Sequence, residues 1–172
     1  PNNNNKRVSV TQGLYDAFEP TDNRRAQWVG SFTNGTTTWY FPHKYKVAAA
    51  TAVTEYEMML RLAEQYLIRA EARAQLENIS GAQEDLNAIR SRAGLAGTDA
   101  DDKAALLLAI EQERKAELFA ECGHRWLDLK RTGRADAILD PLKTDWQSAD
   151  ALFPIPDAER ELNPNLTQND GY

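Results

Sequence analysis

The stretch RLAEQYLIRAEARAQL, Arg61 to Leu76, holds the pattern that decides the fold. Together with the residues before it, from Thr54 on, it carries apolar side chains at 3.6-residue spacing, which predicts an amphipathic helix ending near Asn78. The predicted apolar stripe of this helix consists of Met58, Met59, Leu62, Tyr66 and Leu76. A helix of this length predicts a mainly α protein.

A second helix follows after a short turn. Ser80 and Gln83 form a capping-box pattern, in which the Ser80 hydroxyl accepts from the Gln83 amide and the Gln83 side chain reaches back. This helix is expected to run to Ala93 and to end at Gly94, a residue suited to a left-handed C-cap. Two helices joined by so short a turn pack antiparallel, so we expect an αα-hairpin.

A third helix is predicted to begin at Asp101 and Asp102, because acidic side chains are favourable at a helix N-terminus. It is expected to continue to Gly123. A short helix from about His124 to Arg131 follows, closed by Gly133.

The sequence predicts one region with three parts. Residues 1–53 lack helical periodicity and are rich in aromatic residues, so we expect loops and a few short strands, with 36–47 as the best strand candidate. Residues 54–133 form the helical scaffold. Residues 134–172 are expected to form an extended tail with one helical turn opened by Asp157.

Charge and composition exclude several functions. The net charge of -6 and the pI near 5.0 disfavour nucleic acids and anionic membrane surfaces as partners, because both would repel the chain. Cys122, His43 and His124 do not form a ligand set at metal-binding spacing, and no loop has calcium-ligand spacing. We therefore expect no metal site and no cofactor. The start PNNNNKR, which lacks Met, suggests the middle of a larger product.

The predicted third helix carries charged residues on its apolar stripe: Arg114, Glu117 and Glu121 continue the row of leucines. On the first predicted helix, Arg69 and Arg73 share the apolar face. A buried charge without a partner is strongly destabilising. The simplest interpretation is a structural ion-pair network between arginines of the first helix and glutamates of the third.

Two catalytic interpretations are disfavoured. Adjacent arginines would lower the pKa of both Glu117 and Glu121, which is unsuitable for the general acid of a glycosidase, and carboxylates one turn apart point the same way. Cys122 and His124 diverge near a helix end and have no evident third group to orient them, so we expect a core thiol. Trp126 is interpreted as a packing residue. We expect no enzymatic activity.

Five motifs, in their order, resemble the C-terminal portion of the SusD/RagB family. They are RLAEQYLIRAEARAQL (61–76), DLNAIRSRAGL (85–95), ERKAELFAECGHRWLDLKRTG (113–133), LFPIPDAE (152–159) and NPNLTQNDGY (163–172). TDNRR (21–25) and HKYKV (43–47) also fit the family pattern. The resemblance covers nearly the whole chain and implies a tetratricopeptide-like helical hairpin scaffold with long irregular loops, in which the segment around Cys122 is structural.

The resemblance also implies a function. Members of this family are non-catalytic lipoproteins at the cell surface of the Gram-negative outer membrane, which bind glycans and deliver them to a TonB-dependent (SusC-like) transporter. The family's N-terminal part, with its signal peptide, lipid-bearing cysteine and further helical repeats, is missing from this sequence, so we expect a fragment. Membrane association would then depend on a lipid anchor in that missing part.

Sugar binding needs aromatic faces and planar polar groups. The aromatic-rich first part of the chain supplies them, and the candidates are Tyr15, Trp28, Trp39 and Tyr40. In an alternating strand only one of Trp39 and Tyr40 faces outward, and Trp28, after two arginines, is favoured as a buried residue. The alternative is a helical interaction scaffold that binds a protein partner and makes no sugar contacts in this fragment.

Overall fold

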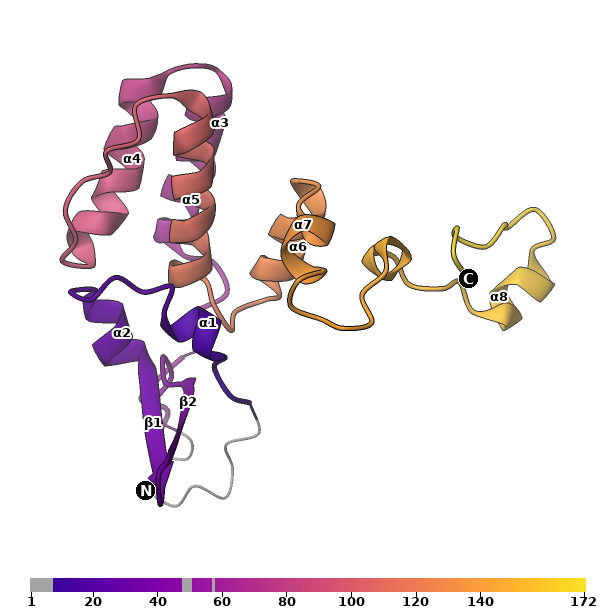
Figure 1. Cartoon of the computed structure of the whole chain (residues 1–172), viewed down its shortest axis with the longest axis horizontal. Coiled ribbons are helices and arrows are strands. Elements are labelled where there is room, and N and C mark those ends of the chain that lie inside the picture. Colours follow the sequence, from indigo (N-terminus) through magenta and orange to yellow (C-terminus); the bar gives the residue numbers. More distant parts are fainter. Residues whose placement is uncertain (1–7, 48–50, 57) are drawn as a thin grey trace. The chain divides into compact units, whose positions relative to one another are not determined.

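The computed structural model describes residues 8–47, 51–56 and 58–172. The chain forms two compact units, Pro1–Cys122 and Gly123–Tyr172. The fold is mainly helical, as predicted, and the described residues contain one sheet of two strands (Figure 1).

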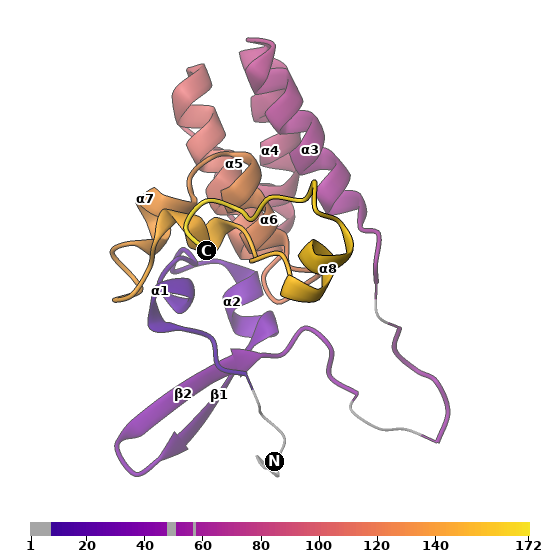
Figure 2. The ribbon, with the colours of Figure 1, turned by 90° about the vertical axis from the view of Figure 1, so that its right-hand side faces the viewer.

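Three helices form the centre of the first unit. Helices α3 (Leu62–Gln75) and α4 (Ile79–Arg92) form the expected hairpin, and α5 (Lys103–Glu117) packs against both (Figures 1 and 2). Small side chains on α3 and α4 allow close approach of larger ones from α4 and α5. The buried core consists of Ala63, Leu67, Ala70, Ala74, Ala82, Leu86, Ile89, Leu106 and Ile110.

Helix α3 begins later than the sequence predicts, and the described residues between Thr54 and Arg61 are not helical. The Glu55 carboxylate accepts hydrogen bonds from the backbone N–H groups of Lys46 and Val47 at 2.7 and 2.8 Å. The Tyr45 hydroxyl accepts from the Met58 N–H at 3.1 Å. These contacts hold the segment as a loop. Glu57 of the predicted helix lies outside the described residues.

The predicted apolar stripe of this helix is therefore wrong in most of its members. Met58 and Met59 are exposed and lie before the helix, and Leu62 and Leu76 are exposed at its ends. Tyr66 packs against the core. The inward face of α3 instead consists of Ala63, Leu67, Ala70 and Ala74, which recur every three or four residues.

Helix α4 is capped by Asn78 rather than by the predicted Ser80. The Asn78 side chain accepts from the Gly81 N–H at 3.1 Å, so the helix begins one residue before Ser80. Its end agrees with prediction, because Ala93 is the C-cap and Gly94 follows with a φ of +78°.

Helix α5 ends at Glu117 and not at Gly123. The Glu117 carbonyl accepts from Lys44 Nζ at 2.6 Å and from Arg61 at 3.1 Å, and cations are favourable at a helix C-terminus. Beyond it, Ala120 and Cys122 have positive φ angles of 56° and 42°, which a helix cannot contain. Cys122 is exposed, so the prediction of a core thiol is wrong.

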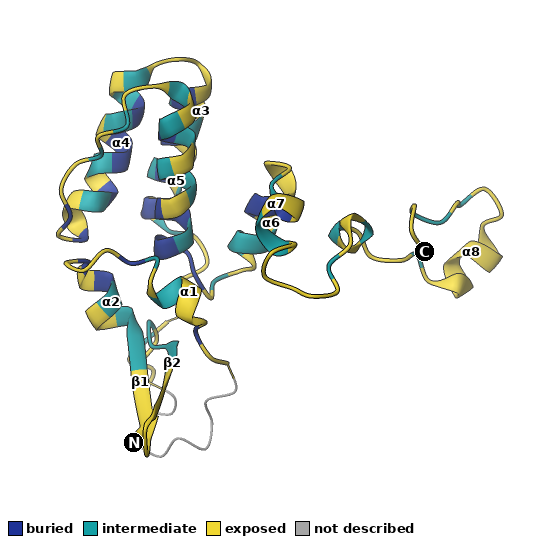
Figure 3. Ribbon diagram, in the orientation of Figure 1, coloured by how far each residue is buried: buried dark blue, intermediate teal, exposed yellow. Residues whose placement is uncertain are grey.

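The start of the first unit holds α1 (Gln12–Tyr15), α2 (Asn23–Trp28) and a hairpin of β1 (Val29–Asn34) and β2 (Thr37–Pro42). Gly35 occupies the first position of the two-residue turn with a φ of +61°, as a primed hairpin turn requires. The hairpin extends from α2 away from the three-helix layer (Figures 1 and 2), and its tip is exposed (Figure 3).

The second unit contains α6 (His124–Arg131), α7 (Ala135–Leu139), a 3-10 turn η2 (Ser148–Ala151) and α8 (Asp157–Leu162). The short helix predicted at 124–131 and the turn opened by Asp157 are both confirmed. Polar contacts fix the remaining tail: the Gln168 amide exchanges hydrogen bonds with the Ile155 backbone at 2.7 and 3.0 Å. Leu129 and Ala135 are the buried apolar residues of this unit.

Candidate ligand-binding sites

Tyr15 and Tyr40 form the wall of a cleft in the first unit. Tyr15 ends α1 and Tyr40 lies on β2, and their rings stack at a centroid distance of 3.8 Å and an angle of 12°. They line a cavity of about 370 Å³ together with Arg25, whose guanidinium lies 5.4 Å from the Tyr15 ring centroid. Because the two rings stack on each other, each has one aromatic face already covered.

Trp39 and Tyr40 point to different environments, as alternation in a strand requires. Tyr40 packs with the small cluster around Val10 and Phe18. Trp39 is 46% exposed and stacks on Phe32 of the partner strand, with ring centroids 6.0 Å apart and an angle of 21°. Of the four predicted sugar-binding residues, Trp39 has the most exposed aromatic side chain.

Trp28 lies in a cationic setting. Lys44 Nζ lies 4.8 Å from its ring centroid, and the guanidiniums of Arg61 and Arg92 lie 5.5 and 5.8 Å away. The indole is half-buried. These cation–π contacts give Trp28 a structural part in the charged cluster beside it.

That cluster joins α2 to the end of α5. Arg24 is buried and lies 2.6 Å from Glu113 and 3.0 Å from Glu117, while Asp22 accepts from its guanidinium at 2.8 Å. Glu117 is fully buried and also accepts from Arg61 and Arg92. The carboxylates of Glu113 and Glu117 on the inward face are thus ion-paired with arginines.

Lys44 belongs to the same cluster. Its ammonium donates to Glu121 at 2.8 Å and lies 4.3 Å from the Phe119 ring centroid. Burial lowers the pKa of Lys44 to about 8, although the hydrogen bond to Glu121 acts in the opposite direction. Burial also raises the pKa of Glu113, against the effect of Arg24.

The predicted partners of Arg69 and Arg73 are wrong. Both arginines bind Asp85 of α4, at 2.6 and 2.9 Å, and not the glutamates of the third helix. The Asp85 side chain is buried between the two hairpin helices. Arg69 and Arg73 lie one turn apart on α3, so both side chains can reach it. Arg114 is buried on α5, in agreement with its predicted inward position.

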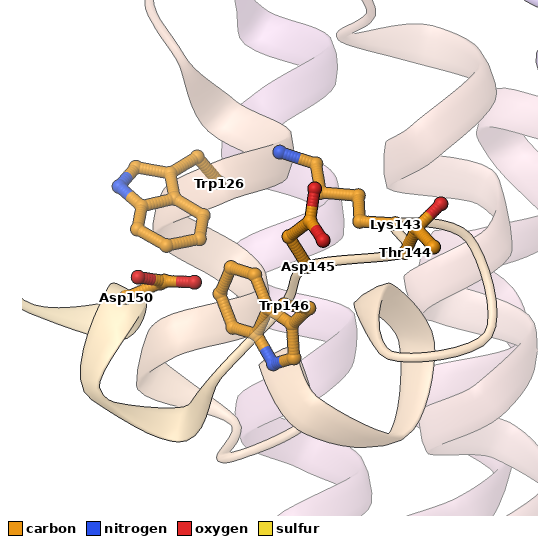
Figure 4. A pocket seen from close by; sticks show the side chains of 6 residues that line it. All are labelled: Trp126, Lys143, Thr144, Asp145, Trp146 and Asp150. Atoms are coloured by element: carbon orange, nitrogen blue, oxygen red, sulfur yellow. The ribbon is translucent and has the colours of Figure 1, made fainter.

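A second cavity, of about 480 Å³, lies within the second unit (Figure 4). Its lining residues come from α6 and from the segment between α7 and the end of η2. They are Trp126, Lys143, Thr144, Asp145, Trp146 and Asp150. The two indoles meet edge to face, with ring centroids 6.2 Å apart and an angle of 81°.

Hydrogen bonds hold one wall of this cavity in place. The Trp146 indole N–H donates to Asp136 Oδ1 at 2.8 Å, and the other Asp136 oxygen accepts from the Ser148 hydroxyl at 2.9 Å. The Asp150 carboxylate accepts from the Gln147 N–H at 2.9 Å and so caps η2. The wall therefore has a defined geometry before any ligand arrives.

Sequence reasoning missed this cavity. It treated Trp126 as a packing residue and did not consider Trp146, which lies 20 residues further along in a segment without periodicity. A signal was present, because two of the four tryptophans, Trp126 and Trp146, fall in the last third of the chain. Their proximity depends on the turn after α7, which no local pattern reveals.

The described residues hold neither a cluster of metal-binding side chains nor a helix able to span a membrane. Residues 8–47, 51–56 and 58–172 contain no group of three side chains able to hold a metal ion. Over the same residues, every helix is too short or too polar to cross a membrane.

The chain matches a known protein family. The model of the SusD family matches residues 25–172, so the chain belongs to the SusD family.

Two relatives come from Formosa agariphila. SusD-like protein P38 is 34% identical over 138 residues, which is 74% of this chain and 27% of that protein. SusD-like protein P25 is 31% identical over 128 residues, which is 68% of this chain and 24% of that protein. The chain thus spans about a quarter of the length of these relatives.

Solved structures share the fold. A SusD superfamily protein from Parabacteroides distasonis matches with a TM-score of 0.75 and 27% identity, covering 95% of this chain and 42% of that one. Surface glycan-binding protein A from Bacteroides thetaiotaomicron matches with a TM-score of 0.69 and 22% identity, covering 99% and 44%.

Proposed function

We propose that this chain is part of a cell-surface protein that binds an oligosaccharide and delivers it to a TonB-dependent outer-membrane transporter. The observation that carries the proposal is the match of the SusD family model over residues 25–172. The shared fold with a protein named as a surface glycan-binding protein supports it.

The side chains support binding without hydrolysis. The carboxylates once considered for a glycosidase, Glu117 and Glu121, each accept from cations at 3.2 Å or less. Carboxylates engaged in these ion pairs point at the protein's own cations and not at a cleft that could hold a glycosidic bond. Aromatic groups, in contrast, lie open, and Trp39 on the hairpin is one of them.

The proposed location is the outer face of the outer membrane. Attachment there would come from a lipid on a part of the protein outside this chain. The net charge of -6 supports attachment through a lipid, because a chain with this charge would not adhere to an anionic surface by electrostatic attraction.

Affinity gel electrophoresis against a panel of polysaccharides tests the binding proposal. We expect one glycan to slow the wild-type chain, and Trp39→Ala on the hairpin or Tyr15→Ala on α1 to restore part of the mobility. Tyr56→Ala is the control, since Tyr56 is an exposed ring away from the cleft. If no polysaccharide changes the mobility, glycan binding by this chain is contradicted.

A protein-binding scaffold is the second candidate function. Helix α3 exposes Leu62 and Ile68, and its C-cap residue Leu76 is exposed as well. If the chain captures the transporter and not a glycan, Ile68→Glu should abolish co-purification with it. Trp39→Ala should then have no effect.

A further inference from the structure

We propose that the cavity between Trp126 and Trp146 is a sugar-binding site that selects uncharged saccharides over uronic or sulfated ones. The inference rests on the proposed glycan-binding function and assigns it a site and a ligand class. The argument uses the size, the aromatic walls, the polar lining and the rigidity of the cavity.

The cavity has the size and shape of a small-ligand site. Its volume of about 480 Å³ falls in the range of roughly 300 to 1,000 Å³ that is usual for such sites. Trp126 and Trp146 stand nearly perpendicular, at 81°, and form two adjacent walls (Figure 4). A pyranose can place its C–H face on one indole while its edge contacts the other.

The polar lining suits hydroxyl groups. Figure 4 shows the Asp150 carboxylate on one side of the two indoles and the Asp145 carboxylate on the other. Carboxylates accept hydrogen bonds from sugar hydroxyls, the Lys143 ammonium donates to sugar oxygens, and the Thr144 hydroxyl can do both.

The charge of the lining sets the ligand class. Two carboxylates, Asp145 and Asp150, against the single ammonium of Lys143 leave one net negative charge at neutral pH. A uronate or sulfate group would be repelled by this lining, and the net charge of -6 on the whole chain adds to the repulsion. Uncharged hydroxyls carry no such penalty.

The site is also preorganised. The Asp136 carboxylate accepts hydrogen bonds from the Trp146 indole N–H at 2.8 Å and from the Ser148 hydroxyl at 2.9 Å. The polar edge of this indole is therefore satisfied within the protein. The indole face, with Lys143 Nζ 6.0 Å from the ring centroid, is then the part that a ligand can contact. A wall fixed in advance lowers the entropic cost of binding.

The test measures binding of the full chain to amylopectin, galactomannan and arabinoxylan as uncharged probes, and to polygalacturonate and alginate as anionic ones. We expect an uncharged polysaccharide to bind, and Trp126→Ala and Trp146→Ala each to weaken its affinity about tenfold through loss of stacking. Phe153→Ala is the matched control, because it removes an exposed aromatic ring of the same unit that does not line the cavity, and its affinity should be unchanged. Circular dichroism checks that each variant is folded.

A charge reversal keeps the test valid should the tryptophan variants misfold. Asp145→Lys changes the exposed rim without removing a wall, and turns the net charge of the lining from negative to positive. We expect it to weaken binding of the uncharged probe and to let polygalacturonate bind.

The outcomes separate the site from the function. A wild-type chain that binds a glycan equally well after folded Trp126→Ala, Trp146→Ala and Asp145→Lys changes overturns the site and leaves the glycan-binding function standing. Wild-type binding to the anionic probes alone overturns the ligand class. Absence of binding to all five probes contradicts the function and the site together.

Discussion

Glu117 shows how a charged residue can occupy a helix face that faces the interior. Its carboxylate is fully buried, yet it accepts from Arg24, Arg61 and Arg92. Removing one partner of such a cluster leaves the remaining charges buried without compensation.

We expect Glu117→Gln to lower the free energy of unfolding by about 3 kcal/mol, because three cations lose their counter-charge. Urea unfolding followed by circular dichroism measures it. Glu84→Gln is the control, since the Glu84 side chain is 80% exposed and lies 3.9 Å from Arg73. If the urea midpoint of Glu117→Gln equals that of Glu84→Gln, the cluster does not stabilise the fold.

Lys44 should give stability an unusual dependence on pH. Its pKa is about 8 in the folded chain and 10.5 when unperturbed, so between these values the unfolded chain binds more protons. Stability contributed by this group therefore rises with pH from about 8 to 10.5, by about 2 to 3 kcal/mol. The measurement is the difference in unfolding free energy between wild type and Lys44→Met, taken at pH 7 and at pH 10. A difference that does not change between these two pH values would refute the lowered pKa.

Among the elements, the N-terminus of α5 illustrates a signal that sequence does carry. The Asp102 side chain accepts from the Ala105 N–H at 2.8 Å, whereas neighbouring Asp101 precedes the cap. We expect Asp102→Ala to cost about 1 kcal/mol of stability and Asp101→Ala less than half of that. Thermal unfolding of both variants measures the two losses of stability. Equal losses would mean that negative charge near the helix N-terminus matters more than the capping hydrogen bond.

Local patterns predicted elements well where local interactions decide them. The helix at 124–131, the start of α5 at Asp102 and the end of α4 at Gly94 all follow from caps and glycines. The start of α3 does not, because Glu55 and Tyr45 bind backbone groups across a loop. Distant partners of this kind leave no trace in periodicity.

The candidate sites show the same contrast between local interactions, which the sequence reveals, and tertiary contacts, which it does not. The sequence indicated that one of Trp39 and Tyr40 faces outward, since alternation in a strand is a local property, and in the structure Trp39 is the exposed one. It placed Arg69 and Arg73 against the wrong helix, because Asp85 lies on the hairpin partner and the choice between two helices is a tertiary one. The Trp126–Trp146 cavity requires two elements to meet and was not predicted.

Across the whole molecule, apolar burial is unevenly distributed (Figure 3). Of the buried apolar residues, Leu129 and Ala135 lie in the second unit, and all others belong to the first. Segments with little buried apolar surface open at low free energy.

We expect native-state hydrogen exchange to follow this distribution. Amides in the middle of α3, α4 and α5 should be protected to the level of global unfolding, and those of α6 to α8 should exchange at least about a hundredfold faster. Within the second unit, the Trp146 indole N–H should be slower than an open indole because Asp136 accepts from it at 2.8 Å. Equal protection of the two units would contradict the expectation.

The hairpin tip has a practical consequence for work on this chain. Gly35 has no atom within 4 Å of the position where a side chain would begin, and the turn around it is exposed. Exposed loop tips tolerate insertions, so a biotin acceptor peptide placed between Gly35 and Thr36 should leave the fold intact. The chain could then be immobilised on a streptavidin sensor through one defined point, with the Trp126–Trp146 cavity far along the sequence from the attachment.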